Sequence, residues 1–410
     1  MNRTFRAVLI AITAVVVAIV LVNLVPAAES PSTSTRANVD DLSFYQTSGT
    51  AAPYPLTSDK EIKNVILCIG DGMGASQIAL ASTKVGGKLH LGRMPVTGLV
   101  QTRSANSRVT DSAAAATALA TGVKTKNGMI GVAPNGQAYR SILELAKAAG
   151  MATGLVATST ITHATPASFG AHVKSRSSEN AIAEQLLANR VNVLLGGGRK
   201  FFLPRSSRNS ARKDNRDLIA EAGQAGYTYV ASEQELRSTS SPRVLGLFHL
   251  EALATVPPEP SLGTLASEAI RLLRQASQAT STGNSGFFLM VEGSQIDSAC
   301  HNNDARRAIR QTLLFDQAVQ AVIDFALQDG HTLVIVTADH ETGGLSLSDA
   351  GERNPETRVR WSTRGHTGSP VPIGALGPGA ATFAGDQDNT DIARKIAQLL
   401  NIRPFPQPSE

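Results

Sequence analysis

The feature that most limits the fold of this chain is a regular alternation of two hydrophobic patterns from Lys60 onward. Short runs rich in β-branched residues are followed by longer stretches whose apolar residues recur at helical spacing. Continuous apolar runs are typical of strands buried on both faces, which occur in parallel sheets covered by helices. The pattern therefore predicts an α/β fold with a largely parallel central sheet and helices on both faces.

The same pattern gives the position of each expected element. We expect strands at 64–69, 152–157, 191–195, 286–291 and 332–337. Helices are expected at 141–149, 180–188, 262–276, 304–327 and 391–400. The segments 206–216 and 238–242 are polar without periodicity, which predicts exposed loops. We expect one large domain over 61–402 and a short C-terminal tail over 403–410.

Composition narrows the class of protein. Of 410 residues, 42% are hydrophobic and 17% charged, which excludes a disordered chain and a protein with many membrane spans. The formal charge of +5 comes without a long basic run, so nucleic acid is not expected as a specific partner. The two cysteines, Cys68 and Cys300, are too few for a disulfide scaffold or a cysteine-rich zinc module, and we expect both to be small buried residues. A bound metal would therefore need histidine and carboxylate ligands.

The N-terminus has the layout of an export signal. Arg3 and Arg6 precede the apolar run 7–22, and a pair of alanines follows a few residues later. The run is shorter than the roughly 20 residues that span a bilayer and long for a signal core, so 1–28 stays open to two interpretations, a signal peptide or a membrane anchor. Both place the body outside the cytoplasm, in the periplasm, secreted or held at the membrane. The polar segment 29–60 is expected to be a linker and N-terminal arm.

Three of the predicted strands lead into acidic residues. Asp71, Glu292 and the pair Asp339-His340 each follow one of these strands. Because the carboxyl ends of parallel strands meet at one edge of the sheet, where α/β proteins place their function, we expect these side chains to lie together. Each alone has an ordinary interpretation, since an aspartate after a strand is often a turn residue that caps the next helix.

Two further histidines are candidate metal ligands. Asp297 and His301 are four residues apart, so on a helix both would face one side and could bind one cation. His366 lies in a polar segment that contains glycine. The ordinary alternatives are a surface ion pair for the first two and a solvated loop histidine for the third.

Ser112 is the candidate nucleophile. It stands with Asp111 at the start of an alanine-rich segment, where the ordinary interpretation is a helix cap. The functional interpretation is that the free amides of a helix N-terminus favour a phosphate dianion beside the serine. A serine hydroxyl needs activation at neutral pH, and neither a Ser-His-Asp arrangement nor a Gly-x-Ser-x-Gly motif is visible, so a metal ion is the expected activator.

Together these residues resemble a known family. The stretches Ile69-Gly-Asp-Gly-Met-Gly74, Val109-Thr-Asp-Ser-Ala-Ala-Ala-Ala-Thr117, Thr162-His-Ala-Thr-Pro-Ala167, Glu292 to His301, Thr337-Ala-Asp-His-Glu-Thr-Gly-Gly344 and His366-Thr-Gly368 resemble the bacterial, metal-dependent alkaline phosphatases, in the family's order. The resemblance runs from about residue 64 to residue 400. It implies a three-layer sandwich and a phosphomonoesterase that releases inorganic phosphate through a phosphoserine, with a role in phosphate acquisition.

The resemblance also implies a role for each site residue. It gives one zinc to Asp297, His301 and His366, a second zinc to Asp71, Asp339 and His340, and a third metal, usually Mg²⁺, to Asp71, Thr165 and Glu292. It makes Ser112 the phosphorylated nucleophile and Arg176 the residue that binds two phosphate oxygens. Small phosphomonoesters are the implied substrates, and a homodimer is the implied assembly.

Two positions depart from the best-known bacterial member. His163 stands where that enzyme has an aspartate, which puts Mg²⁺ at the third site in doubt and admits Co²⁺ or Zn²⁺. Ser298 stands where it has a lysine that helps hold phosphate, so product release is expected to be faster. Asp111 and His163 are expected beside the site rather than among its metal ligands.

Other functions stay open at this stage. A phosphodiesterase of the same superfamily is the main alternative, although an arginine at position 176 favours monoesters. A sulfatase would need a cysteine or serine in its own formylglycine motif, which the segment around Ser112 does not supply. An inactive metal- or phosphate-binding surface protein would be expected to have lost some ligands. The physiological substrate cannot be read from the sequence, and loops such as 200–215 are expected to determine it.

Overall fold

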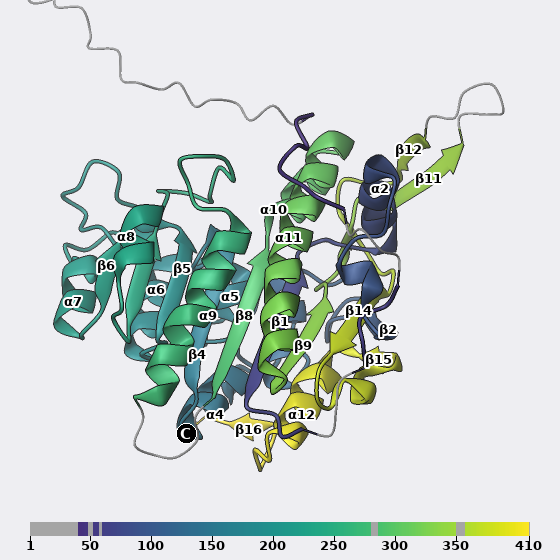
Figure 1. Ribbon diagram of the computed structural model, residues 1–410. Coiled ribbons are helices and arrows are strands. Elements are labelled where there is room, and N and C mark those ends of the chain that lie inside the picture. Colours follow the sequence, from purple (N-terminus) through teal and green to yellow (C-terminus); the bar gives the residue numbers. More distant parts are fainter. Residues whose placement is uncertain (1–39, 48–51, 57–59, 280–285, 350–356, 410) are drawn as a thin grey trace, which may run out of the picture. The chain divides into compact units, whose positions relative to one another are not determined.

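The fold is built on one large sheet. A computed structural model describes residues 40–47, 52–56, 60–279, 286–349 and 357–409, so the predicted export segment 1–28 lies outside the described residues. Ten strands form the central sheet in the order β15-β2-β14-β9-β1-β8-β4-β5-β7-β6 (Figure 1). Its strands are β1 (Asn64–Gly70), β2 (Val96–Gln101), β4 (Ala152–Thr160), β5 (Val193–Gly197), β6 (Thr228–Val230), β7 (Val244–Leu247), β8 (Phe287–Gly293), β9 (Thr332–Thr337), β14 (Val371–Leu376) and β15 (Gly385–Asp388).

The centre of the sheet is parallel. β1 pairs in parallel with β8 on one side and β9 on the other, and β4, β5, β7 and β6 continue the parallel order. Among the described strands of this sheet, β14 alone runs antiparallel, to both β9 and β2. Every residue of β1, β8 and β9 is buried, which explains their continuous apolar sequences. The prediction of a largely parallel α/β sheet is confirmed.

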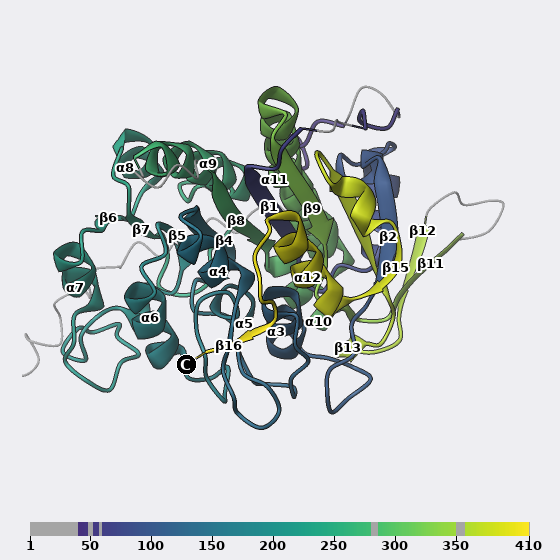
Figure 2. The same cartoon turned by 90° about the horizontal axis from the view of Figure 1, so that it is seen from below.

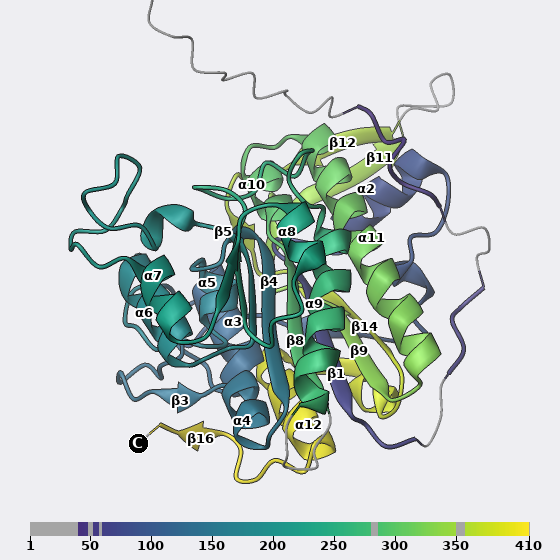
Figure 3. The same cartoon turned by 60° about the vertical axis from the view of Figure 1, so that its left-hand side comes forward.

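Helices cover both faces of this sheet. In Figure 2, α9 (Leu262–Gln278) and α11 (Ala305–Asp329) lie on one side of the strands, and α3 (Ser112–Thr121), α4 (Ile142–Ala148) and α12 (Asn389–Leu399) lie on the other. Figure 3 shows α9 and α11 side by side, as their mutual packing requires. The expected three-layer arrangement is therefore present, with the apolar core between each helix layer and the sheet.

The smaller elements connect these layers. The other helices are α2 (Ala75–Val85), α5 (Ala164–Ala167), α6 (Glu179–Ala188), α7 (Leu218–Gln224), α8 (Glu233–Ser238) and α10 (Gln295–His301), with short 3₁₀ turns η1 (Leu91–Arg93), η2 (Arg199–Phe201) and η3 (Ala380–Phe383). The other strands form three pairs: β3 (Tyr139–Arg140) with β16 (Gln407–Pro408), β10 (Glu341–Thr342) with β13 (His366–Thr367), and β11 (Leu345–Asp349) with β12 (Thr357–Trp361).

The predicted boundaries hold to within about three residues. β9 matches its predicted range from end to end, whereas β4 and β5 run further toward their carboxyl ends than predicted. Two helices begin one residue late because the polar residue before each is a cap: Asp304 accepts the backbone N–H of Arg307, and Ser141 accepts that of Glu144. The polar segments 206–216 and 238–242 contain no strand and lie outside helices except at Ser238, as expected of loops.

The N-terminal arm docks on the body at residues 40–47. The Tyr45 hydroxyl donates a 2.6 Å hydrogen bond to the buried Asp316 on α11, whose carboxylate also accepts the backbone N–H groups of His90 and Leu91 at 2.8 Å. This part of the expected linker is therefore packed rather than free. Among the described residues, we find no helix that combines the length and apolar character needed to cross a membrane.

Candidate active site

The site lies at the carboxyl edge of the parallel strands. Ile69 at the end of β1 pairs with Glu292 on β8 and with Thr337 on β9, so Asp71, Glu292 and the Asp339-His340 pair leave neighbouring strands at the same level. Glu292 lies inside β8 and not after it, since the ladder with β1 extends one residue beyond. Asp71 does not cap α2, because Gly74 occupies the cap position.

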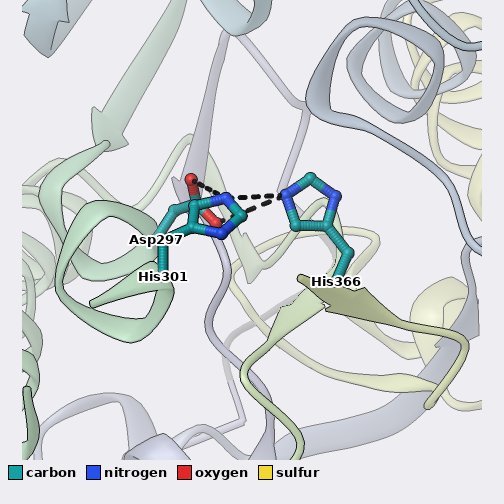
Figure 4. Close-up of side chains that lie close together, drawn as sticks. All are labelled: Asp297, His301 and His366. Atoms are coloured by element: carbon teal, nitrogen blue, oxygen red, sulfur yellow. Dashed lines mark hydrogen bonds and ion pairs between the residues drawn. The ribbon is translucent and has the colours of Figure 1, made fainter. Parts of the chain in front are cut away.

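Two short elements bring the remaining ligand candidates to this edge. α10 begins two residues after β8 and carries Asp297 and His301 on one side of its turn. His366 lies on the short strand β13 instead of in the expected loop, because it pairs with Thr342 on β10, close after His340. Figure 4 shows Asp297, His301 and His366 turned toward one another from these two elements.

The first group of side chains, which we call the His301 cluster, comprises Asp297, His301 and His366. The His301 Nε2 atom lies 3.1 Å from His366 Nε2 and 3.2 Å from Asp297 Oδ2, and His366 Nε2 lies 3.6 Å from Asp297 Oδ1 (Figure 4). Ligand atoms at roughly 2.0–2.1 Å from a tetrahedral zinc are roughly 3.3 Å apart. The three atoms are thus spaced like three corners of a zinc coordination tetrahedron.

The hydrogen bonds of the two histidines support the same conclusion. His301 Nδ1 lies 2.5 Å from the carbonyl oxygen of Arg364, and His366 Nδ1 lies 2.9 Å from that of Thr110. A carbonyl only accepts, so each Nδ1 is assigned the proton and each Nε2 keeps a lone pair. Two lone pairs that face each other at this distance need a cation between them, a metal ion or a proton.

The second group, which we call the His340 cluster, comprises Asp71, Asp339, His340 and Ser112. His340 Nε2 lies 3.5 Å from Asp71 Oδ1, 3.3 Å from Asp339 Oδ2 and 3.3 Å from Ser112 Oγ. The Nδ1 atom of His340 contacts the hydroxyl of Thr342, which itself donates to Asp297. Ligand atoms of Asp71, His340 and the nearby Asp297 lie within 4.8 Å of one another, so this region can hold a cation, with Asp339 and Ser112 each 3.3 Å from His340 Nε2.

The third group, which we call the Glu292 cluster, comprises Asp71, His163, Glu292 and Thr165. Ligand atoms of the first three lie within 4.8 Å of one another. Glu292 Oε1, Thr165 Oγ1 and both carboxylate oxygens of Asp71 are buried and have no hydrogen-bond partner among the described residues. Buried polar atoms are rarely left unsatisfied. Oxygen ligands of this kind suit a hard divalent cation, so the residues fit the third metal of the family.

Burial and mutual repulsion disturb the titration of these groups. Burial, followed by the charges of Asp339 and Asp297, raises the pKa of Asp71 well above its usual range. Burial also raises the pKa of Glu292 to about 8 and lowers that of His340 to about 4. The hydrogen bond that protonated His301 donates to the Asp297 carboxylate raises the pKa of His301 to about 9. The clustered carboxylates favour bound cations, since a cation removes the repulsion that these shifts reflect.

Arg176 is held from two sides next to the N-terminal cap of α3. Its Nη1 donates to Asp111 at 3.1 Å, and its Nη2 donates to His163 Nε2 at 2.9 Å. Asp111 caps α3 by accepting the N–H of Ala114, so the prediction of a cap is correct for Asp111, while Ser112 is the first residue of the helix. The guanidinium is therefore held against Asp111, the residue that directly precedes Ser112 at the start of α3.

The structure thus brings all the predicted site residues to one edge of the sheet. The two cysteines are free and buried, as expected for packing residues, and burial raises the pKa of each thiol to about 12. One residue that sequence reasoning did not single out is Thr342, which joins Asp297 to His340. Its position two residues after a ligand candidate was the only signal, because the contact with Asp297 spans 45 residues of sequence.

Comparison with known proteins identifies the family. The family model for alkaline phosphatase matches residues 62–358 and 348–402. Alkaline phosphatase 4 of Bacillus subtilis is 38% identical to this chain over 83% of its length and 89% of the length of that enzyme. The alkaline phosphatase of Escherichia coli is 33% identical over 86% of this chain and 89% of its own.

Solved structures agree with this assignment. The alkaline phosphatase of the Antarctic bacterium TAB5 superimposes with a TM-score of 0.76 at 36% identity, covering 84% of this chain and all of that one. A variant of that enzyme, with a histidine replaced by aspartate and Mg bound in its M3 site, has a TM-score of 0.73 at 35% identity and covers 85% of this chain and 99% of that one. By sequence, fold and site, this chain belongs to the alkaline phosphatase family of metal-dependent phosphomonoester hydrolases.

Proposed function

We propose that this protein hydrolyses small phosphomonoesters outside the cytoplasm, through a phosphoserine on Ser112, with two Zn²⁺ ions and a third divalent ion. The observation that supports this most strongly is the place of Ser112, whose Oγ lies 3.3 Å from His340 Nε2. In the same cluster, both carboxylate oxygens of Asp71 and Oδ2 of Asp339 are buried without a hydrogen-bond partner among the described residues. A serine that only capped its helix would not need such neighbours. Here Asp111 already provides the cap.

The proposed ligand sets follow the three clusters. Asp297, His301 and His366 would hold the first zinc, and Asp71, Asp339 and His340 the second. Asp71, Thr165 and Glu292 would hold the third ion. When bound, such ions supply Lewis acidity to the attacking and leaving oxygens of an in-line phosphoryl transfer.

His163 bears on the identity of the third ion. Its Nε2 atom is already engaged with Arg176, while its Nδ1 atom is buried without a hydrogen-bond partner among the described residues. Burial also lowers the pKa of His163 to about 4, so the ring is neutral at the pH of catalysis. A neutral imidazole is a good ligand for Zn²⁺ or Co²⁺ and a poor one for Mg²⁺. Mg²⁺ at this site would therefore be held by the oxygen ligands alone, whereas Zn²⁺ or Co²⁺ could also bind His163.

The residues of the chain account for the two chemical steps. In the first, Ser112 Oγ forms a bond to phosphorus as the ester P–O bond breaks, and the serine proton ends on the departing oxygen, which leaves as the alcohol. In the second, water attacks the phosphoserine, the bond between Ser112 Oγ and phosphorus breaks, phosphate is released and the serine hydroxyl is regenerated with a proton from the water. Arg176 has a planar fork that can bind two phosphoryl oxygens throughout, and Asp111 and His163 orient that fork.

Access to the site is uneven. The His301 side chain is 38% exposed, whereas those of His340 and Asp71 are 0% and 1% exposed. Substrate and water would therefore reach the site from the side of the His301 cluster, and the buried Asp71 and His340 form its closed end. This arrangement suits a reaction in which the leaving alcohol and the incoming water use the same open side.

The export part of the proposal depends on the sequence alone. Arg3, Arg6 and the apolar run 7–22 favour a location outside the cytoplasm, in the periplasm, secreted or anchored. N-terminal sequencing of the protein from its native host would distinguish a cleaved signal from an anchor, since a chain that begins after residue 28 has been processed. Recovery of the intact N-terminus in the cytosolic fraction would contradict export.

Replacement of Ser112 tests the chemical proposal. Ser112→Ala should abolish both turnover and the acid-trapped phosphoenzyme, while the metal content per chain stays that of the wild type. Ser107→Ala is a matched control, because it makes the same change five residues earlier, outside the clusters. A Ser112→Ala variant that turns over at the wild-type rate would remove this serine from the mechanism.

A further inference from the structure

A further buried carboxylate lies next to the three clusters, at the start of β10. Glu341 is 5% exposed, and its carboxylate accepts four hydrogen bonds. Oε1 accepts from Gln77 Nε2 at 2.8 Å and from the Leu345 N–H at 3.2 Å, and Oε2 accepts from the Gly344 N–H at 3.2 Å and from the Thr367 hydroxyl. We call Glu341, Gln77 and Thr367 the Glu341 hub.

Gln77 extends the hub to two more segments. Its side chain is 1% exposed and lies on α2. Besides Glu341, its Nε2 donates to the carbonyl oxygen of Thr342 at 2.8 Å and lies 3.8 Å from the sulfur of Cys300. Its Oε1 accepts the N–H of Gly74, so every polar atom of this side chain has a partner.

The hub touches the chain one residue away from each histidine ligand candidate. Glu341 follows His340 directly, Thr367 follows His366, and Cys300 precedes His301. These contacts go to the side chains of the neighbouring residues, and they thereby hold the residue next to each imidazole in place. Within the described part of the chain, the hub makes no hydrogen bond with Ser112 or Arg176. Any effect of the hub on the reaction therefore passes through the histidines next to it.

The packing around the hub leaves it little freedom. A side chain on Gly74 would place its Cβ 2.4 Å from Glu341 Cγ, so α2 can approach the hub only with glycine there. The hub also joins segments that are distant in the sequence, since Gln77 and Glu341 are 264 residues apart. It therefore fixes the position of α2, β10 and β13 relative to one another at the point where the ligands diverge.

We propose that the Glu341 hub positions His301, His340 and His366, and that it thereby sets the affinity and the geometry of the zinc sites. The inference rests on the proposed function, because it assumes that these histidines bind metal. Groups that orient metal ligands from behind commonly contribute about 10- to 100-fold to metal affinity. The Glu341 hub differs from the usual case in that it holds the residues next to the ligands rather than their imidazole rings.

Two pairs of variants separate positioning from general stability. Glu341→Gln keeps the size of the side chain but places an amide N–H₂ against N–H donors. Thr367→Val removes one hydroxyl donor at equal size, and Thr367→Ser restores it. Asp316→Asn is the control, because Asp316 is an equally buried carboxylate that accepts three hydrogen bonds far along α11 from the clusters.

Three measurements on the full-length protein apply to every variant. They are Zn²⁺ affinity by competition with a chelator, the visible absorption spectrum of the Co²⁺-loaded protein, and the melting temperature after treatment with EDTA. We expect Glu341→Gln and Thr367→Val to lose about 10- to 100-fold in Zn²⁺ affinity and to change the Co²⁺ spectrum. Thr367→Ser should resemble the wild type, and Asp316→Asn should lower the melting temperature without changing Zn²⁺ affinity.

The outcomes distinguish failure of the hub from failure of the proposed function. If the wild type binds Zn²⁺ and Co²⁺ but Thr367→Val and Glu341→Gln leave affinity and spectrum unchanged, the hub has no positioning role and the proposed function stands. The hub likewise has no positioning role if Glu341→Gln behaves like Asp316→Asn, with a lower melting temperature and unchanged affinity. If the wild type binds neither metal, the proposed function and the hub inference both fall.

Discussion

Binding of metal to this protein should release protons, and the structure gives the number. In the metal-free chain, His301 and Glu292 hold protons at neutral pH, because the hydrogen bond that His301 donates to Asp297 raises the pKa of His301 to about 9 and burial raises that of Glu292 to about 8. A metal ion takes the place of those protons, since ligands bind it in their deprotonated form.

The magnitude follows from the two pKa values. At pH 7, a group with a pKa near 9 is about 0.99 protonated and one near 8 about 0.9 protonated, so roughly two protons leave per chain on full loading. His340 and His163 add nothing, because burial lowers the pKa of each to about 4. Two released protons make the overall affinity rise about 100-fold per pH unit near pH 7.

Calorimetry in two buffers of different ionisation enthalpy measures this release. Zn²⁺ is titrated into EDTA-treated, dialysed protein at pH 7, and the dependence of the apparent enthalpy on the buffer gives the number of protons. Glu292→Gln is the matched variant, since it has the same size and no proton to lose, and its release should be smaller by about one. A wild-type release near zero, or an unchanged release in Glu292→Gln, would refute the assignment of these protons.

Four further predictions concern phosphate inhibition, metal removal, the pH dependence of stability and the N-terminal arm. Arg176→Lys should weaken inhibition by inorganic phosphate about 10-fold at unchanged metal content, because a point charge replaces a two-pronged donor; equal inhibition constants would contradict the proposed contact. Removal of metal should destabilise the fold by roughly 3–4 kcal/mol if the free metal concentration was about 100–1,000 times the dissociation constant. The EDTA-treated protein should also melt at a lower temperature at pH 9 than at pH 6.5. The folded chain binds more protons than the unfolded chain in that range, since the pKa values of His301 and Glu292 are raised by folding, so stability falls as pH rises; a melting temperature that rises with pH would refute this. Tyr45→Phe should cost roughly 1–3 kcal/mol in urea unfolding, because Asp316 loses its hydroxyl donor, while activity is retained; loss of activity with unchanged stability would be the contrary result.

Much of the fold was accessible from the sequence because the central strands are buried on both faces. β1, β8 and β9 have continuous apolar sequences for that reason, and their ends mark where Asp71, Glu292 and Asp339 emerge. The spacing of Asp297 and His301 was equally informative, since a single helical turn brings His301 Nε2 to 3.2 Å from Asp297 Oδ2. Local sequence carried these predictions because each depends on a single element or on the order of parallel strands.

The remaining features depend on contacts between distant segments. His366 lies on a strand only because β10 lies beside it, and the sequence around His366 has the composition of a loop. In the sequence, Gln77 and Glu341 look like ordinary polar residues that lie 264 positions apart. In the fold, Gln77 Nε2 lies 2.8 Å from Glu341 Oε1. No local pattern encodes such pairs, because their positions follow from the tertiary packing of α2 on the end of the sheet.

The most direct test of the proposed activity compares two substrates on one preparation. We would measure kcat/KM for p-nitrophenyl phosphate and for bis(p-nitrophenyl) phosphate at alkaline pH, and determine the metal content of the same sample. The proposed function predicts a clear preference for the monoester, with about two Zn²⁺ and one further divalent ion per chain. A preference for the diester, or absence of monoester hydrolysis at full metal loading, would contradict it.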